Sequence, residues 1–111
     1  MNLSTEVIEK SDKKKILKVA GEVDAYTAPE LKANLNPLTE DEGAEVIVDL
    51  TEVSYIDSTG LGIFIGALKS AENHDATLRL TGLNDRVKRL FTITGLDEVI
   101  TIDDENTEEA K

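Results

Sequence analysis

Alternating hydrophobic and polar residues predict two strands at the start of the chain. Leu3 to Ile8 and Ile16 to Val19 are short alternating or apolar segments, and the polar stretch Glu9 to Lys15 separates them. Two such segments around a polar connection are typical of a β-hairpin. We expect Gly21 to end the second strand.

The next segment carries the signals of a helix start. Thr27 and Glu30 match the T-x-x-E capping box, in which side chains satisfy free backbone N–H groups, and Pro29 falls in the first turn. Tyr26 is placed to pack on Leu31 as a hydrophobic staple. The buried stripe of this helix is expected to be Leu31, Leu35 and Leu38.

A run of apolar residues predicts the central strand, after the acidic segment Thr39 to Gly43 interrupts the helical pattern. The run is apolar enough to be buried on both faces of a sheet, and it contains Val46, Ile47, Val48 and Leu50. From Asp57 the apolar spacing becomes helical and continues to the polar turn Glu72 to Asp75. The stripe of this second helix contains Leu61, Phe64, Ile65 and Leu68.

The last third of the chain continues the alternation of strands and helices. Thr77 to Leu80 predicts a short strand, and Asn84 is placed to cap a third helix that Gly95 ends. Leu96 suits the hydrophobic contact that often accompanies such a glycine. The third helix is expected to bury Val87, Leu90 and Phe91, and the last strand to contain Val99, Ile100 and Ile102.

This order of elements predicts the fold class. Strand, strand, helix, strand, helix, strand, helix, strand indicates one α/β domain, with a mixed β-sheet of four to five strands and three to four α-helices. We expect the domain to span residues 1–102. Residues 103–111 are acidic and poor in apolar side chains, which predicts a frayed helix or a disordered tail.

Composition narrows the classes of function. The chain has no cysteine and a single histidine, His74, which excludes disulfides and cysteine-based metal sites and leaves too few ligands for a zinc site. We expect neither a metal nor a cofactor. No apolar run approaches the roughly 18 residues of a membrane span, which favours a cytoplasmic protein. The net charge of −11 disfavours nucleic acid or an anionic membrane as a partner, because each contact would begin against repulsion. A basic protein partner is favoured, although the acidity would also be explained by solubility alone.

The segment Val48 to Gly62 holds the candidate functional residue, Ser58, at the start of the second helix. Two interpretations stay open, because the hydroxyl could cap the helix or could accept a phosphate. Gly60 and Gly62 favour phosphorylation, since their missing side chains would let another protein's active site approach. Close packing between helix and sheet is the alternative reason for these glycines, which cost a helix up to about 1 kcal/mol each.

Four motifs spread over nearly the whole chain point to a known family. They are Gly21 to Leu31 (GEVDAYTAPEL), Val48 to Leu50 (VDL), Tyr55 to Gly62 (YIDSTGLG) and the ending from Leu90-Phe91 to Gly95-Leu96. Together they resemble the STAS-domain family, and most closely its single-domain anti-sigma-factor antagonists of the bacterial general stress response. Each motif alone is a weak signal, but the four in order are specific.

The resemblance implies a regulatory cycle in which this chain is not an enzyme. Ser58 matches the serine that is phosphorylated by an anti-sigma factor with serine kinase activity. The unphosphorylated protein binds that partner and frees the sigma factor, and a metal-dependent serine phosphatase restores the phosphorylated form. The resemblance also places the loop after the second strand beside the phosphoacceptor turn. The implied partner-binding residues are Asp24, Tyr26, Thr27, Asp57, Ser58, Thr59, Gly60, Leu61 and Gly62.

Other functions fit the sequence less well. Gly60, Gly62 and Gly66 follow a strand as in a dinucleotide site, but the G-x-G-x-x-G pattern needs its third glycine where Ile65 stands. A hydrolase is disfavoured because the G-x-S-x-G pattern is absent and His74 lies in a polar turn. The remaining alternative is a STAS subunit of a larger signalling or transport assembly.

Overall fold

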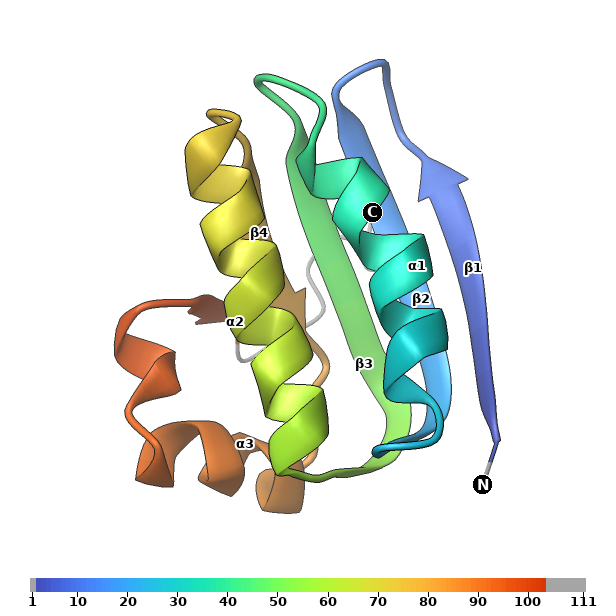
Figure 1. The fold of residues 1–111 in the computed structure, drawn as a ribbon, viewed down its shortest axis with the longest axis vertical. Coiled ribbons are helices and arrows are strands. Elements are labelled where there is room, and N and C mark those ends of the chain that lie inside the picture. The colour runs from blue at the N-terminus through green and yellow to red at the C-terminus, as the bar shows by residue number, and fades with distance from the viewer. Residues whose placement is uncertain (1, 104–111) are drawn as a thin grey trace.

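Five strands form one mixed sheet in the order of the sequence, in a computed structural model that describes residues 2–103. The strands are β1 (Leu3–Glu9), β2 (Lys14–Val23), β3 (Glu45–Ile56), β4 (Thr77–Thr81) and β5 (Thr101–Asp103). The helices are α1 (Ala28–Thr39), α2 (Ser58–Asn73) and α3 (Asp85–Ile93), and a 3₁₀ turn, η1 (Leu96–Glu98), follows. Strand β1 is antiparallel to β2 and the other pairs are parallel, which confirms the predicted fold class (Figure 1).

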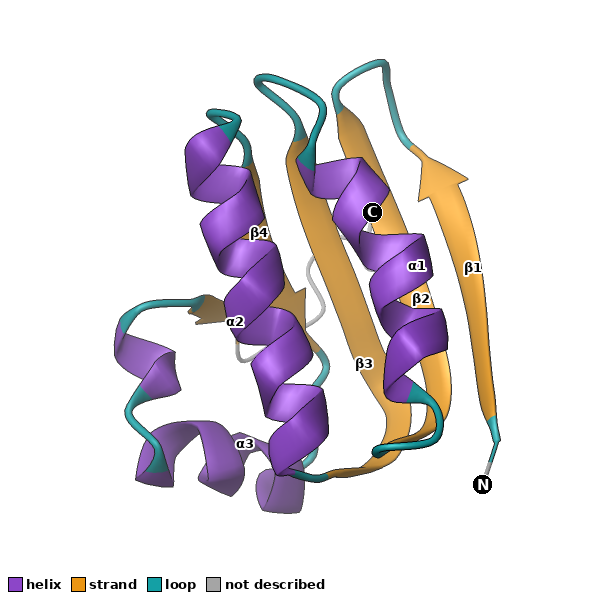
Figure 2. Ribbon diagram, in the orientation of Figure 1, coloured by secondary structure: helices purple, strands orange, loops and turns teal. Residues whose placement is uncertain are grey.

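Helices α1 and α2 cover the same face of the sheet (Figure 2). The Thr39 hydroxyl at the end of α1 donates a hydrogen bond to the Ser70 hydroxyl of α2 at 2.8 Å. The predicted stripes form the core beneath them: Leu31, Leu35, Leu61 and Phe64 are buried, and Leu38, Ile65 and Leu68 are partly buried. None of the helices in residues 2–103 combines the length and apolar character that crossing a membrane requires.

Strand β2 is longer than predicted, because Gly21 lies inside it and does not end it. The pairing of β2 with β3 shifts register between Lys18 and Ala20 and again between Gly21 and Glu22. Gly21 has φ +113°, and a Cβ there would overlap the carbonyl oxygen of Asn2. Glycine therefore lets an irregular strand continue, and β2 reaches Val23 beside the end of β3.

Helix α3 forms as its end signals predict. The Asn84 side chain accepts a hydrogen bond from the backbone N–H of Val87 at 2.8 Å. Gly95 follows the helix with φ +77°, the left-handed conformation that glycine adopts readily. Val87 and Phe91 are buried and Leu90 is partly buried, so the predicted stripe faces the core.

The last strand lies slightly later in the chain than the sequence predicts. Val99 is 60% exposed and precedes the strand, whereas Ile100 is buried just before β5 begins. Asp103 is the last residue of β5 and accepts hydrogen bonds from the guanidinium of Arg79 at 3.0 and 3.1 Å. The predicted acidic tail began at Asp103, which the structure places in β5. Its other residues, 104–111, lie outside the described residues, and the tail stays a prediction there.

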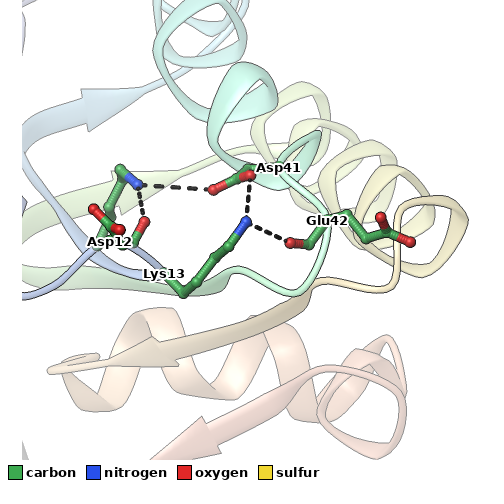
Figure 3. A network of polar contacts seen from close by, with 5 residues as sticks. Asp12, Lys13, Asp41 and Glu42 are labelled. Atoms are coloured by element: carbon green, nitrogen blue, oxygen red, sulfur yellow. Dashed lines mark hydrogen bonds and ion pairs between the residues drawn. The ribbon is translucent and has the colours of Figure 1, made fainter.

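An ion pair joins two loops at the end of the sheet opposite the start of α2 (Figure 3). Lys13 Nζ donates to Asp41 Oδ1 at 2.9 Å and to the carbonyl oxygen of Glu42 at 2.8 Å. The hydrogen bond from Lys13 holds the pKa of the Asp41 carboxyl below its ordinary value. Both side chains are exposed, so this pair positions the two loops and adds little to the free energy of unfolding.

Candidate functional site

The loop after β2 and the start of α2 lie side by side at the carboxyl ends of β2 and β3. The two strands are parallel, and Val23 is in register with Ile56. The backbone N–H of Asp57 donates to the carbonyl oxygen of Val23 at 3.0 Å. The residues after each strand, 24–27 and 57–62, therefore belong to one edge of the molecule, the edge where ligands of open α/β sheets commonly bind.

Asp57, and not Ser58, caps helix α2. Its backbone is extended, and its Oδ1 accepts a hydrogen bond from the N–H of Gly60 at 3.0 Å. Ser58 is the first residue of the helix, and its side chain is exposed. The Ser58 hydroxyl forms no hydrogen bond with any other residue in the range 2–103. The capping interpretation of Ser58 is thus wrong, and its hydroxyl is accessible at the surface.

The electrostatic setting of Ser58 combines two opposed influences. It stands at the N-terminus of a helix of 16 residues, where free N–H groups and the helix dipole favour negative charge. The carboxylate of Asp57 is the neighbouring side chain and disfavours it. An anionic group on Ser58 is therefore tolerated by the fold, while it concentrates negative charge at the surface.

The two glycines after Ser58 serve different purposes. Gly60 is buried, and a Cβ at that position would lie 2.6 Å from Val23 Cγ1 and 2.9 Å from Ile56 Cγ2. Gly62 is exposed, and a Cβ there would meet nothing within 4 Å. Gly60 therefore follows the packing interpretation, because it lets α2 approach the strand ends. Gly62 leaves the surface beside Ser58 low and open.

Thr27 does not form the predicted capping box with Glu30. Its hydroxyl donates to the carbonyl oxygen of Glu22 at 2.8 Å and accepts from the N–H of Asp24 at 2.9 Å. Asp24 Oδ1 in turn accepts from the N–H groups of Tyr26 and Thr27 at 2.9 and 3.0 Å. The prediction was wrong because the Thr27 hydroxyl makes its hydrogen bonds within the loop that precedes the helix. Helix α1 therefore has no side-chain cap.

Tyr26 is not a hydrophobic staple. Its side chain is 87% exposed, whereas Leu31, its predicted partner, is fully buried. Tyr55, three residues before Ser58, is a second exposed aromatic residue, at 43%, and is not among the predicted site residues. The sequence does contain a signal for this exposure. Tyr55 directly precedes the buried Ile56, and neighbouring residues of a strand face opposite sides of the sheet. Exposed tyrosines are frequent anchors of protein interfaces.

Exposure divides the predicted partner-binding residues into two groups. The exposed ones can touch a partner directly, and they are Tyr26, Ser58, Thr59 and Gly62, with Asp57 partly exposed. The buried ones can act only by shaping the surface from beneath, and they are Asp24, Thr27, Gly60 and Leu61. The structure brings the loop after β2 and the start of α2 together, but it offers a smaller contact surface than the sequence suggests.

Comparisons with known proteins identify the family and the fold. The family model described as STAS domain matches residues 5–110. An anti-sigma-B factor antagonist of Listeria monocytogenes is 51% identical over 102 residues, which cover 92% of this chain and 90% of the relative. The crystal structure of an anti-sigma factor antagonist from Mycobacterium paratuberculosis has a similar fold, with a TM-score of 0.84 and 23% identity over 96% of this chain and 90% of that one. The Bacillus cell fate determinant SpoIIAA in its phosphorylated form has a TM-score of 0.70 and 18% identity over 96% of each chain.

Proposed function

Because this chain belongs to the STAS-domain family, we propose that it is an anti-sigma-factor antagonist whose binding is switched off by phosphorylation of Ser58. It acts as a binding protein and a kinase substrate, not as an enzyme, and it acts in the cytoplasm, where sigma factors direct transcription. The name of the Listeria relative supports the class of partner. The observation that carries the switch is the exposed Ser58 hydroxyl, free of hydrogen bonds to the described residues, beside a helix cap that its neighbour supplies.

The proposed partner is an anti-sigma factor that is also a serine kinase. The Ser58 oxygen attacks the γ-phosphorus of ATP, the bond from that phosphorus to the β,γ-bridging oxygen breaks, and ADP leaves. The hydroxyl proton passes to a base of the kinase. A metal-dependent serine phosphatase then hydrolyses the phosphoserine, returning the hydroxyl and inorganic phosphate.

The surroundings of Ser58 suit a substrate serine better than a structural one. Capping by Asp57 leaves the hydroxyl with no role in holding the helix. Gly62, on the exposed side of the next turn, adds no side chain that would obstruct a kinase active site. Thr59 is also exposed, so a mapping experiment has to distinguish two adjacent hydroxyls.

We expect the cognate anti-sigma factor and ATP to add one phosphate to this protein, on Ser58. Ser58→Ala should abolish the labelling, because it removes the only oxygen that we place in the kinase active site. Thr59→Ala is the matched control and should be labelled like the wild type. Mass spectrometry of the intact protein and its peptides measures both results. Labelling of the Ser58→Ala variant at the wild-type rate would contradict the assignment.

A further inference from the structure

The exposed face of helix α3 carries two arginines, Arg86 and Arg89, and one carboxylate, Asp85, so it has net positive charge on a chain whose net charge is −11. Arg86, Arg89 and Ile93 are exposed, and Ile93 is 74% exposed. With 3.6 residues per turn, positions 86, 89 and 93 lie within one narrow face of the helix. The opposite face holds Val87 and Phe91, which are buried. We call the exposed side, defined by Arg86, Arg89 and Ile93, the α3 face.

The two arginines of the α3 face lack ion-pair partners within residues 2–103. Arg79, by contrast, pairs with Glu45 at 2.9 Å and with Asp103 at 3.0 Å. The chain has 23 acidic and only 12 basic residues, so carboxylates are plentiful. That two neighbouring arginines nevertheless lack an ion pair is therefore unusual. Arginine is enriched at protein interfaces relative to the rest of the surface.

Helix α3 lies at the same end of the molecule as Ser58. Phe91 of α3 packs on Phe64 of α2, with ring centroids 5.9 Å apart. Phe64 follows Ser58 by less than two helical turns, roughly 9 Å along the axis. The Asn84 side chain, just before α3, donates to the carbonyl oxygen of Val53 in β3 at 3.1 Å. Figure 1 accordingly shows α3 at the end of the sheet where α2 begins.

We propose that the α3 face is a second contact surface for the anti-sigma factor, and that it binds a cluster of acidic side chains on that partner. The proposal rests on the proposed function, since it takes the anti-sigma factor as the occupant. Guanidinium groups pair with carboxylates through two parallel hydrogen bonds, which gives such a contact strength and orientation. Ile93 supplies the apolar area between the charges.

The α3 face carries net positive charge, whereas the surface around Ser58 carries the negative charge of Asp57. A phosphate on Ser58 adds negative charge beside Asp57, but it leaves the charge of Arg86 and Arg89 unchanged. The face therefore acts as a docking contact, which holds the kinase while the Ser58 hydroxyl reacts. A docking contact of this kind affects KM and leaves kcat unchanged, because it is equally strong in the ground state and the transition state.

Charge reversal at two sites tests this proposal. The double variant Arg86→Glu with Arg89→Glu is compared with Lys10→Glu and Lys69→Glu, two exposed lysines away from α3, so that both variants have the same net charge. We expect the arginine variant to bind the anti-sigma factor about 10- to 100-fold more weakly, and the lysine variant to bind within about twofold of the wild type. In steady-state phosphorylation, KM should rise by a similar factor for the arginine variant while kcat stays the same.

The outcomes distinguish failure of the α3 contact from failure of the proposed function. Equal affinities and equal KM values for the two charge variants would overturn the α3 contact alone, provided that the wild type binds. Failure of the wild type to bind the anti-sigma factor would overturn the proposed function and the α3 contact with it. Melting temperatures of both variants, expected to stay near that of the wild type, confirm that the exposed substitutions leave the fold intact.

Discussion

Phosphorylation of Ser58 is expected to weaken binding to the anti-sigma factor by roughly 30-fold to several thousand-fold, while the free energy of unfolding hardly changes. The free energy of unfolding is expected to stay nearly constant because of the local structure around Ser58. A phosphate adds about −1.5 to −2 charges, and at a helix N-terminus the dipole and free N–H groups favour such charge by about 0.3–1 kcal/mol. Because the Ser58 hydroxyl forms no hydrogen bond to the described residues, its modification breaks no contact there.

The predicted loss of affinity follows from the removal of water from the phosphate when the complex forms. On association, the phosphate would lose water beside the carboxylate of Asp57, against a partner surface shaped for a bare hydroxyl. Disrupting a buried polar contact of this kind commonly costs about 2–5 kcal/mol, and about 1.4 kcal/mol corresponds to a tenfold change in affinity. The loss of affinity should therefore greatly exceed any change in stability.

Affinity, melting temperature and amide chemical shifts measured on both forms check this prediction. Ser58→Asp should reproduce part of the loss of binding. Ser58→Ala, which removes the hydroxyl and adds no charge, should bind nearly as the wild type does. Large shift changes far from Ser58, or a melting temperature lowered by many degrees, would show that phosphorylation acts by rearranging the domain.

Gly60→Ala is expected to destabilise the protein by about 1–3 kcal/mol, the usual cost of forcing an extra methyl group into a packed core. The added Cβ would lie 2.6 Å from Val23 Cγ1, 2.9 Å from Ile56 Cγ2 and 3.2 Å from the carbonyl oxygen of Val23. Two of these atoms belong to β-branched side chains, which have little rotamer freedom to move aside. The strand end or the first turn of α2 must therefore shift.

Gly62→Ala is the matched control, two residues later in the same helix. A Cβ there meets nothing within 4 Å, and alanine is the better helix former, so we expect stabilisation by about 0.5–1 kcal/mol. Urea unfolding of the two variants measures the difference in free energy. Equal effects of the two substitutions would show that Gly60 is not a close-packing position.

The parts of the fold that the sequence predicted well have regular periodicity and distinctive ends. The stripes of α1, α2 and α3 follow from helical spacing alone, and Asn84 and Gly95 mark the two ends of α3 because few residues satisfy helix ends equally well. The continuous apolar run after Gly43 identified β3 as a buried strand. Such signals are local, so the rest of the structure does not alter them.

The predictions that were wrong concern residues with two chemically similar choices. Gly21 can end a strand or continue it with positive φ, and only the pairing of β2 with its neighbours decides between them. The Thr27 hydroxyl can cap a helix or close a loop, and in the structure it donates its hydrogen bond to the carbonyl oxygen of Glu22. Asp57 and Ser58 are both good helix caps in adjacent positions, so which of them has a free side chain depends on where α2 begins.

Release of the sigma factor tests the central claim, the Ser58 switch, most directly. A preformed complex of anti-sigma factor and sigma factor is titrated with this protein, either unphosphorylated or phosphorylated on Ser58, and free sigma factor is measured. The unphosphorylated protein should release sigma factor at concentrations where the phosphorylated protein releases almost none. Equal release by the two forms would contradict the account.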